Sequence, residues 1–433
     1  MEDPRKIIAA APMSTTQWLI VAVMVGLNAL DGFDVLSISF ASPGIAKAWG
    51  IDRGALGLVL SMELIGMAAG SLLLGGIADR IGRRRTILFC LIAMAAGMFG
   101  AATAHDVVTL SIWRVLTGTG IGGMLAATNA AVAEAANDRR RNLAVILMAA
   151  GYPIGTIVGG LISKVLLASF DWRAVFVFGG CATVAFIPIV LLAAPESIAF
   201  LMHRRGADML ARINHTLARF GHAPLSAVPD AEPRVRKAGP AELFAGEYLQ
   251  RTVALTIAYL AHIMTFYFIL KWIPKIVVDM GYPPPLAAGV LVWASVGGAA
   301  GSLLLGFMTL RFRLYGLTII AMLASAILVT AFGRQMGGLG WLSLTAGIAG
   351  FATNAGVVGL YALIAKSFPT RLRAGATGFV IGIGRGGSAL APALAGGLFQ
   401  IGYGLPLVAT LMAGGSLIAA ATLFAARRSL ADQ

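Results

Sequence analysis

Six ionisable side chains lie within long apolar stretches of this sequence: Asp31, Asp34, Glu63, Arg114, Lys271 and Arg385. At the centre of a bilayer an ionised side chain costs about 2.5–3.5 kcal/mol on insertion scales, so each one is a candidate functional residue. Three acids and three bases can also pair internally, and salt bridges that merely hold helices together are the structural alternative. His262 lies in similar surroundings, where a packed neutral imidazole and a proton relay are both open.

Asp31 and Asp34 form the pair with the clearest chemical consequence. A spacing of three residues places both carboxylates on one face of a helix. They lie about fifteen residues into the first apolar run, which is close to mid-membrane at a rise of 1.5 Å per residue. Two carboxylates that close in a low dielectric cannot both be ionised, so one of them carries a proton. Loading and releasing that proton is the chemistry of a proton-coupled carrier.

The composition indicates that membrane-spanning helices hold these residues in position. Of 433 residues, 58% are hydrophobic and 12% are charged, whereas soluble domains have about 25% charged residues. This excludes a soluble enzyme and a disordered protein, and continuous apolar runs argue against a transmembrane barrel. At about 20 residues per crossing, we predict an all-α membrane protein with helices over 16–42, 54–77, 86–104, 108–132, 143–168, 173–193, 250–273, 286–310, 316–334, 339–364, 375–400 and 403–425.

The basic residues predict the orientation of these helices. The net charge is +14, and most of the Lys and Arg residues fall in segments on one side of the predicted membrane. This is the positive-inside bias, and it predicts that both termini are cytoplasmic. The positive charge is therefore interpreted as a topology signal, and nucleic acid is not an expected partner.

A polar central segment and internal sequence matches divide the chain into two halves. Residues 195–249 are too charged to cross a bilayer, which gives an N-terminal six-helix half over 1–194 and a C-terminal one over 250–433. The sequence SLLLG at 71–75 recurs at 302–306, and ATNA at 127–130 recurs at 352–355. A duplicated six-plus-six bundle resembles the major facilitator superfamily, whose substrate site lies between the halves near the bilayer midplane.

The segment 75–85, GGIADRIGRRR, matches the signature of that superfamily between its second and third helices, G-x-x-x-D-R-x-G-R-R. The resemblance implies that Asp79 caps a helix of the other half, that Arg80 belongs to the same conformational latch, and that Arg83 pairs with Glu134. A plain basic loop retained for topology is the alternative. The corresponding site in the second half has Leu310 in place of the aspartate, so any latch there must differ.

The sequence Asp31-Gly-Phe-Asp34 in the first helix further resembles the aromatic acid:H+ symporter family, as do YFILKWIP at 267–274 and GRGG at 384–387. The resemblance implies uptake of an aromatic carboxylate, which needs a cation at the site. Arg385 is the first choice for that cation. Arg114 is the second, although it can equally pair with Asp31 or Asp34. Tyr152 and Tyr267 are candidate walls for the aromatic ring.

Glu63 and Lys271 are charged where many relatives of that family have uncharged residues. Both are expected toward the outer half of the membrane, on opposite halves of the protein. We hypothesise that they pair when the outer side closes, so that exchanging the two charges should preserve function. Alternatively, Lys271 is a second cation for a substrate carboxylate, which would suit a dicarboxylic or longer substrate.

Together these features predict a proton-coupled importer of an aromatic carboxylate such as a hydroxybenzoate or protocatechuate, working by alternating access in a bacterial inner membrane as a monomer. Its expected partners are that small carboxylate, protons and the lipid bilayer. No cofactor, metal site or catalytic residue set is predicted. One alternative is an importer of a non-aromatic acid such as muconate or a sugar acid. An efflux antiporter is another, but Thr156 stands where antiporters typically have proline. A membrane-embedded enzyme or a sensor would need chemistry that the sequence does not display.

Overall fold

The computed structural model describes residues 3–202, 208–227, 240–334 and 337–427, and every secondary-structure element in these residues is a helix. Twelve of the helices are long and apolar enough to cross a membrane, which confirms the predicted fold class. The first six are α2 (Thr15–Trp49), α3 (Arg53–Ile81), α4 (Arg83–Thr103), α5 (Val107–Ala135), α6 (Arg141–Ser169) and α7 (Arg173–Ala193). The second six are α10 (Glu247–Asp279), α11 (Pro284–Met308), α12 (Leu314–Gly333), α13 (Leu339–Ser367), α14 (Thr370–Gln400) and α15 (Leu405–Ala425).

Two of these helices continue past a proline where the sequence predicts that they end. Helix α2 runs through Pro43, and α10 runs through Pro274. Proline has no N–H to bond the carbonyl four residues earlier. In α2 that carbonyl belongs to Ser39, and the hydroxyl of Ser42 donates to it at 2.9 Å. A serine side chain therefore satisfies the group that proline leaves open, which allows the helix to continue inside the protein.

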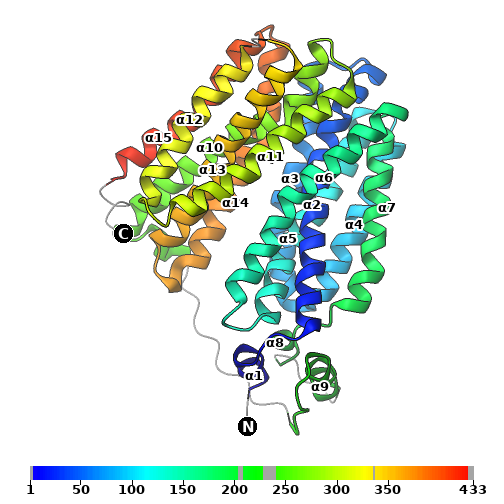
Figure 1. The fold of residues 1–433 in the computed structure, drawn as a ribbon, viewed down its shortest axis with the longest axis vertical. Helices are drawn as coiled ribbons and strands as arrows, with labels where there is room; N and C mark the ends of the chain where they lie inside the picture. Colours follow the sequence, from blue (N-terminus) through cyan, green and yellow to red (C-terminus); the bar gives the residue numbers. More distant parts are fainter. Residues whose placement is uncertain (1–2, 203–207, 228–239, 335–336, 428–433) are drawn as a thin grey trace.

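The polar segment between the two sets of helices, 195–249, has secondary structure of its own. It contains α8 (Ile198–Met202), α9 (Met209–Phe220) and the 3-10 helix η1 (Pro240–Phe244). Helix α9 buries Ile213, Leu217 and Phe220 along one side, which is the apolar stripe of a helix that lies against a protein surface. A short helix α1 (Pro4–Ala10) precedes the first span, and Figure 1 shows α1, α8 and α9 gathered below the N-terminal half.

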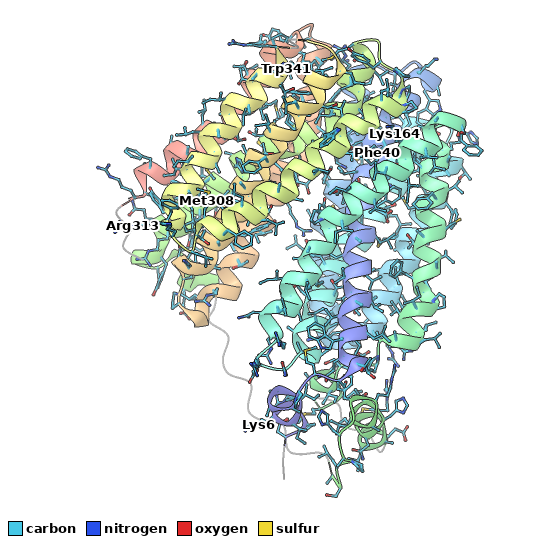
Figure 2. All side chains as sticks on the ribbon, viewed as in Figure 1. Lys6, Phe40, Lys164, Met308, Arg313 and Trp341 are labelled. Atoms are coloured by element: carbon cyan, nitrogen blue, oxygen red, sulfur yellow. The ribbon has the colours of Figure 1, made fainter. Side chains whose placement is uncertain are left out.

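The spanning helices form two bundles, α2–α7 and α10–α15, which lie side by side in Figure 1. We call the face at which α2 begins and α15 ends the terminal face, and the opposite one the far face. Lys6 and Arg313 lie toward the terminal face, and Lys164 and Trp341 lie toward the far face (Figure 2). The bundles approach each other toward the far face and diverge toward the terminal face (Figure 1).

Polar contacts between the halves fasten the far face. Arg53 at the start of α3 pairs with Asp279 at the end of α10, at 2.9 Å. Gln400 at the end of α14 donates to Asp52 at 3.1 Å. Just below, α3 and α14 approach so closely that a Cβ on Gly57 would lie 2.5 Å from the main-chain oxygen of Pro392. The structure is therefore one in which the halves are closed together at the far face.

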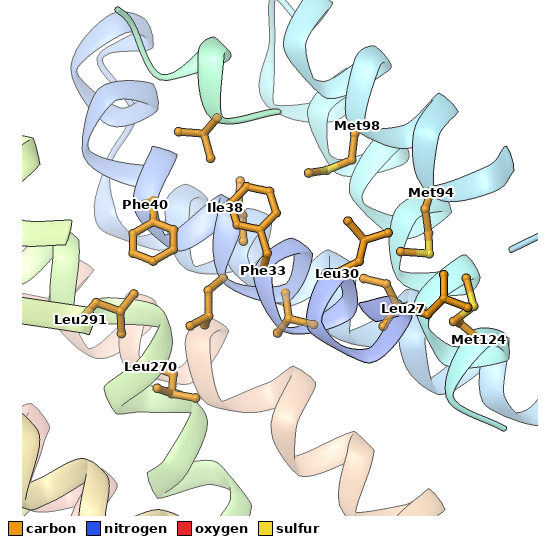
Figure 3. Packing of buried hydrophobic residues seen from close by; sticks show 14 of the residues in the cluster. Leu27, Leu30, Phe33, Ile38, Phe40, Met94, Met98, Met124, Leu270 and Leu291 are labelled. Carbon is orange, nitrogen blue, oxygen red and sulfur yellow. The ribbon is translucent and has the colours of Figure 1, made fainter. Parts of the chain in front are cut away.

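Helix α2 is the central element of the core. Most of its residues are buried, and Figure 3 shows its apolar side chains between two sets of neighbours. Leu27 and Leu30 lie toward the methionines of α4 and α5, whereas Phe40 lies toward Leu270 and Leu291 of the other half. A helix that is apolar all round is expected in such a position. The carboxylates of Asp31 and Asp34 on α2 are consequently held deep inside the protein.

Candidate functional site

Charged side chains gather where α2, α3, α5 and α10 meet, with Glu63 of α3 at the centre. One carboxylate oxygen of Glu63 pairs with the guanidinium of Arg114 from α5. The other lies 3.1 Å from Nζ of Lys271 from α10, which also donates to the main-chain oxygen of Val35. All three charged side chains are 0% exposed. One buried carboxylate thus binds two cations, and one of these comes from the other half.

Close packing of α3 and α5 explains why Arg114 reaches Glu63. A Cβ on Gly118 would lie 2.0 Å from the main-chain oxygen of Glu63, and one on Gly122 would lie 2.2 Å from that of Met67. Only a residue without a Cβ allows two helices to approach this closely. Arg114 precedes Gly118 by about one helical turn, so it is delivered directly beside Glu63. The G-x-G-x-G run of α5 therefore assembles the charge cluster.

The carboxylates of α2 lie next to this cluster without being paired by it. Arg114 donates to the main-chain oxygen of Asp34 at 3.0 Å, while both side-chain oxygens of Asp34 are buried and accept no hydrogen bond from the described residues. The Oδ1 atom of Asp31 is likewise buried without a donor. Between them, Gly32 packs against α6, where a Cβ would lie 2.2 Å from the main-chain oxygen of Tyr152. Helix α2 therefore presents buried carboxylate oxygens that lack the donors such groups normally have.

The positive charge of Arg385 acts on the buried carboxylate of Asp31. It lies midway along α14, and its Nη1 donates to the main-chain oxygen of Met67 on α3 at 2.9 Å, across the boundary between the halves. The side chain is partly exposed. A Cβ added to Gly382 or Gly386 on the same helix would meet open space. Among the described residues Met67 is the hydrogen-bond acceptor of this guanidinium, so the rest of its fork can bind a carboxylate.

The two tyrosines proposed from the sequence face each other across the halves. Tyr152 belongs to α6 and Tyr267 to α10, and their side chains are neighbours that interact directly. Two further tyrosines, which no pattern in the sequence around them distinguishes, belong to the same surroundings: Tyr259 of α10 and Tyr361 of α13. Their hydroxyl groups lie 3.1 Å apart. The one sequence feature that points to this tyrosine pair is the GRGG run at 384–387, because Tyr259 packs against its first residue, Gly384.

The residues that the sequence assigns to a latch lie at the terminal face, well apart from this cluster. Arg83 pairs with Glu134 at 2.9 Å, and Ser197 donates to the other oxygen of Glu134. The neighbouring Glu196 accepts from the main-chain N–H groups of Arg83 and Arg84 at 2.8 and 3.2 Å. A carboxylate at the start of a helix satisfies free N–H groups there, so Glu196 anchors the central segment to α4.

The other two residues assigned to the latch are Asp79 and Arg80. Arg80 is exposed at the end of α3. The side chain of Asp79 lies outside the described residues. Its expected contact with the other half therefore remains a prediction.

The structure brings together most of the residues that the sequence nominates, but it pairs them differently. Glu63 and Lys271 are in contact as hypothesised, and Arg114 is a third member that the hypothesis did not include. Charge exchange between Glu63 and Lys271 is consequently the wrong test, because it would place a lysine beside Arg114. His262 lies elsewhere: its ring nitrogens are within 2.9 Å of Ser416 and the main-chain oxygen of Thr353, inside the C-terminal half. Within the described residues no group of three or more His, Cys, Asp or Glu side chains is arranged to hold a metal ion.

Comparisons with known proteins agree with this architecture. Residues 24–333 match the family model of the Major Facilitator Superfamily. A gallate transporter of Pseudomonas putida is 29% identical over 95% of this chain and 92% of its own length. A 4-hydroxybenzoate transporter of the same organism is 28% identical over the same shares. Among solved structures, a D-xylose-proton symporter superposes with a TM-score of 0.72 at 19% identity, covering 93% of this chain and 96% of that one. This chain is a multi-pass membrane protein of the Major Facilitator Superfamily.

Proposed function

We propose that this protein imports an aromatic carboxylate together with protons, by alternating access between its two halves. The observation that carries the proposal is the juxtaposition of unpartnered carboxylate oxygens on α2 with the partly exposed guanidinium of Arg385. An ionised carboxylate without donors is costly to bury, so Asp31 and Asp34 are the groups to be neutralised by a proton. Arg385 then binds the carboxylate of the substrate, and the relatives suggest that this carboxylate is on an aromatic ring.

In this proposal Tyr152 and Tyr267 form the walls beside the substrate ring. They come from α6 and α10, so their separation changes when the halves move relative to each other. Aromatic side chains supply flat apolar surface and a polar hydroxyl at once, which suits a substrate with a ring and polar substituents. Arg385 of the C-terminal half donates to the main-chain oxygen of Met67 in the N-terminal half. A carboxylate bound to Arg385 would therefore replace or reinforce a hydrogen bond between the halves.

The triad of Glu63, Arg114 and Lys271 serves as the far-face gate. Arg114 and Glu63 belong to one half and Lys271 to the other, so the link between Glu63 and Lys271 exists only while the far face is closed. This use of Lys271 is favoured over a role as a second substrate cation, since both of its contacts are to protein oxygens. At the opposite face, Asp79, Arg80, Arg83 and Glu134 act as the latch of the terminal side, which we assign to the cytoplasm from the distribution of basic residues.

The test is uptake of radiolabelled 4-hydroxybenzoate into proteoliposomes with an inward proton gradient imposed or collapsed. The wild-type protein should accumulate the acid only when the gradient is present. Asp31→Asn should lose gradient-driven accumulation while retaining exchange of labelled for unlabelled acid, because exchange requires no net proton movement. Asp171→Asn is the matched control, since Asp171 is 60% exposed at the far-face turn before α7, and it should behave as wild type.

Accumulation that is unaffected by collapse of the gradient would refute proton coupling. Absence of uptake of any aromatic acid, by protein shown to be folded, would refute the aromatic substrate. Muconate and sugar acids would then be tested as the non-aromatic alternative.

A further inference from the structure

A pair of tyrosines beside Arg385 has no role in the proton-coupled cycle proposed above. The hydroxyl groups of Tyr259 and Tyr361 are 3.1 Å apart, and their rings are 5.7 Å apart at an angle of 35°. The two residues differ sharply in accessibility. Tyr259 is 2% exposed, whereas Tyr361 is 41% exposed.

The accessible side of Tyr361 is directed toward the boundary between the halves. Gly359, two residues earlier, faces α12, where a Cβ would lie 2.5 Å from Thr318. Two residues along an α-helix correspond to about 200° of rotation, so Tyr361 lies on nearly the opposite side of α13. Its electrostatic neighbours agree with this direction, because they include Tyr267 of its own half and Tyr152 of the other half. Tyr361 therefore belongs to the same space between the halves as Tyr152.

The hydroxyl pair retains hydrogen-bonding capacity for a ligand. A phenolic hydroxyl has one donor hydrogen and two acceptor lone pairs. The contact between the two tyrosines uses one hydrogen, so one donor and several lone pairs remain in either orientation. Since Tyr259 is buried, the capacity that a ligand can reach is on Tyr361.

The placement of Tyr259 is linked to that of Arg385 through α14. The ring of Tyr259 packs on Gly384, where a Cβ would lie 1.9 Å from its Cδ1 atom. Gly384 directly precedes Arg385 in the chain, so the backbone that carries the guanidinium also supports the tyrosine pair. Two groups that can bind a ligand thus lie close to one stretch of α14. The guanidinium of Arg385 can bind a carboxylate, and the hydroxyl of Tyr361 has hydrogen-bonding capacity to spare. This arrangement suits a ligand with a carboxylate at one end and a hydroxyl group at the other.

We propose that Tyr361 is a specificity-determining residue that hydrogen-bonds a ring hydroxyl of the substrate, with Tyr259 as the residue that positions it. The proposal rests on the proposed function, since it takes the substrate to be an aromatic carboxylate. It narrows that class to acids whose ring carries a hydroxyl group. A site built to hydrogen-bond a hydroxyl discriminates against the analogue that lacks it, because its own polar group is then left unpaired.

The experiment compares equilibrium binding of 4-hydroxybenzoate and benzoate to the full-length protein in lipid nanodiscs. Wild type should bind 4-hydroxybenzoate more tightly. Tyr361→Phe should weaken binding of 4-hydroxybenzoate by about three- to tenfold, the range that one neutral hydrogen bond supports, and should change binding of benzoate by less than about twofold. Tyr259→Phe should produce a smaller loss with the same selectivity. Tyr403→Phe is the matched control, because Tyr403 is 42% exposed in the turn after α14, and it should change neither affinity.

The two acids separate the outcomes. If Tyr361→Phe weakens both acids equally or neither, the assignment of Tyr361 is wrong while the proposed function stands. If wild type binds neither acid, the proposed function fails and this inference fails with it. A selective loss in Tyr361→Phe that is absent from Tyr403→Phe supports the assignment.

Discussion

Glu63→Gln is the perturbation whose consequence follows most directly from the structure. The substitution keeps the shape of the side chain and removes the charge that Arg114 and Lys271 share. Arg114 belongs to the same half as Glu63, so it loses its partner in every conformation and this loss cancels between states. Lys271 belongs to the other half. It is left buried beside Arg114 while the far face is closed, and it reaches water when the far face opens.

The magnitude follows from the burial of the ammonium group. Removing one partner of a buried ion pair costs about 3–5 kcal/mol, and here that cost applies mainly to the closed far face. Each 1.4 kcal/mol is a factor of ten in an equilibrium constant. Glu63→Gln should therefore shift the ratio of open to closed far face by roughly 10²- to 4 × 10³-fold. Adding Lys271→Met removes the unpaired ammonium and should return the ratio most of the way toward wild type.

Cysteine labelling from the far side measures this ratio. Val292 on α11 is 7% exposed and packs against Gly160 of the other half, so a cysteine at 292 reacts only when the far face opens. The parent carries Val292→Cys and Cys181→Ser, because Cys181 is exposed and Cys90 is buried. A membrane-impermeant maleimide should label the Glu63→Gln protein at least tenfold faster than the parent, and the double variant near the parental rate. Equal rates in the parent and Glu63→Gln, or a double variant as fast as the single one, would refute the gate.

Three further substitutions test other parts of the argument. Gly118→Ala should lower the melting temperature by several degrees, since overpacking costs about 1–3 kcal/mol. Gly316→Ala is the control and should not lower it, because a Cβ there meets open space. Equal melting temperatures for the two variants would contradict the role of close α3–α5 packing. Asp34→Asn should leave stability nearly unchanged, because the carboxylate accepts no hydrogen bond from described residues. The variant should nevertheless lose substrate accumulation driven by a proton gradient. Retained accumulation would exclude Asp34 from proton coupling. Glu196→Ala removes the acceptor for two N–H groups of α4 and should cost about 1 kcal/mol, read as a lower melting temperature, whereas an unchanged value would show that the central segment is anchored by other contacts.

The sequence by itself determines the class of this protein and which charged side chains lie within its apolar spans. Apolar runs of crossing length need no tertiary information, because the bilayer requires each span to satisfy its own backbone. Charges inside those runs are equally visible, since burial makes each one costly. Helix ends are less predictable. The boundary predicted at Pro43 is wrong because the hydroxyl of Ser42 replaces the hydrogen bond that proline cannot make. Helix α10 also continues through Pro274.

Only the tertiary structure decides which charges meet. Sequence position does not select the partner of Glu63. Its pairing with Arg114 depends on how closely Gly118 lets α5 approach α3. The unpaired state of Asp34 follows from the same geometry, because Arg114 binds its main-chain oxygen instead of its carboxylate. Tyr361 is one of 8 tyrosines in the sequence, and only its rotation on α13 and its contact with Tyr259 distinguish it. Spacing along one helix is encoded locally, whereas contacts between helices depend on side-chain volumes from several segments at once.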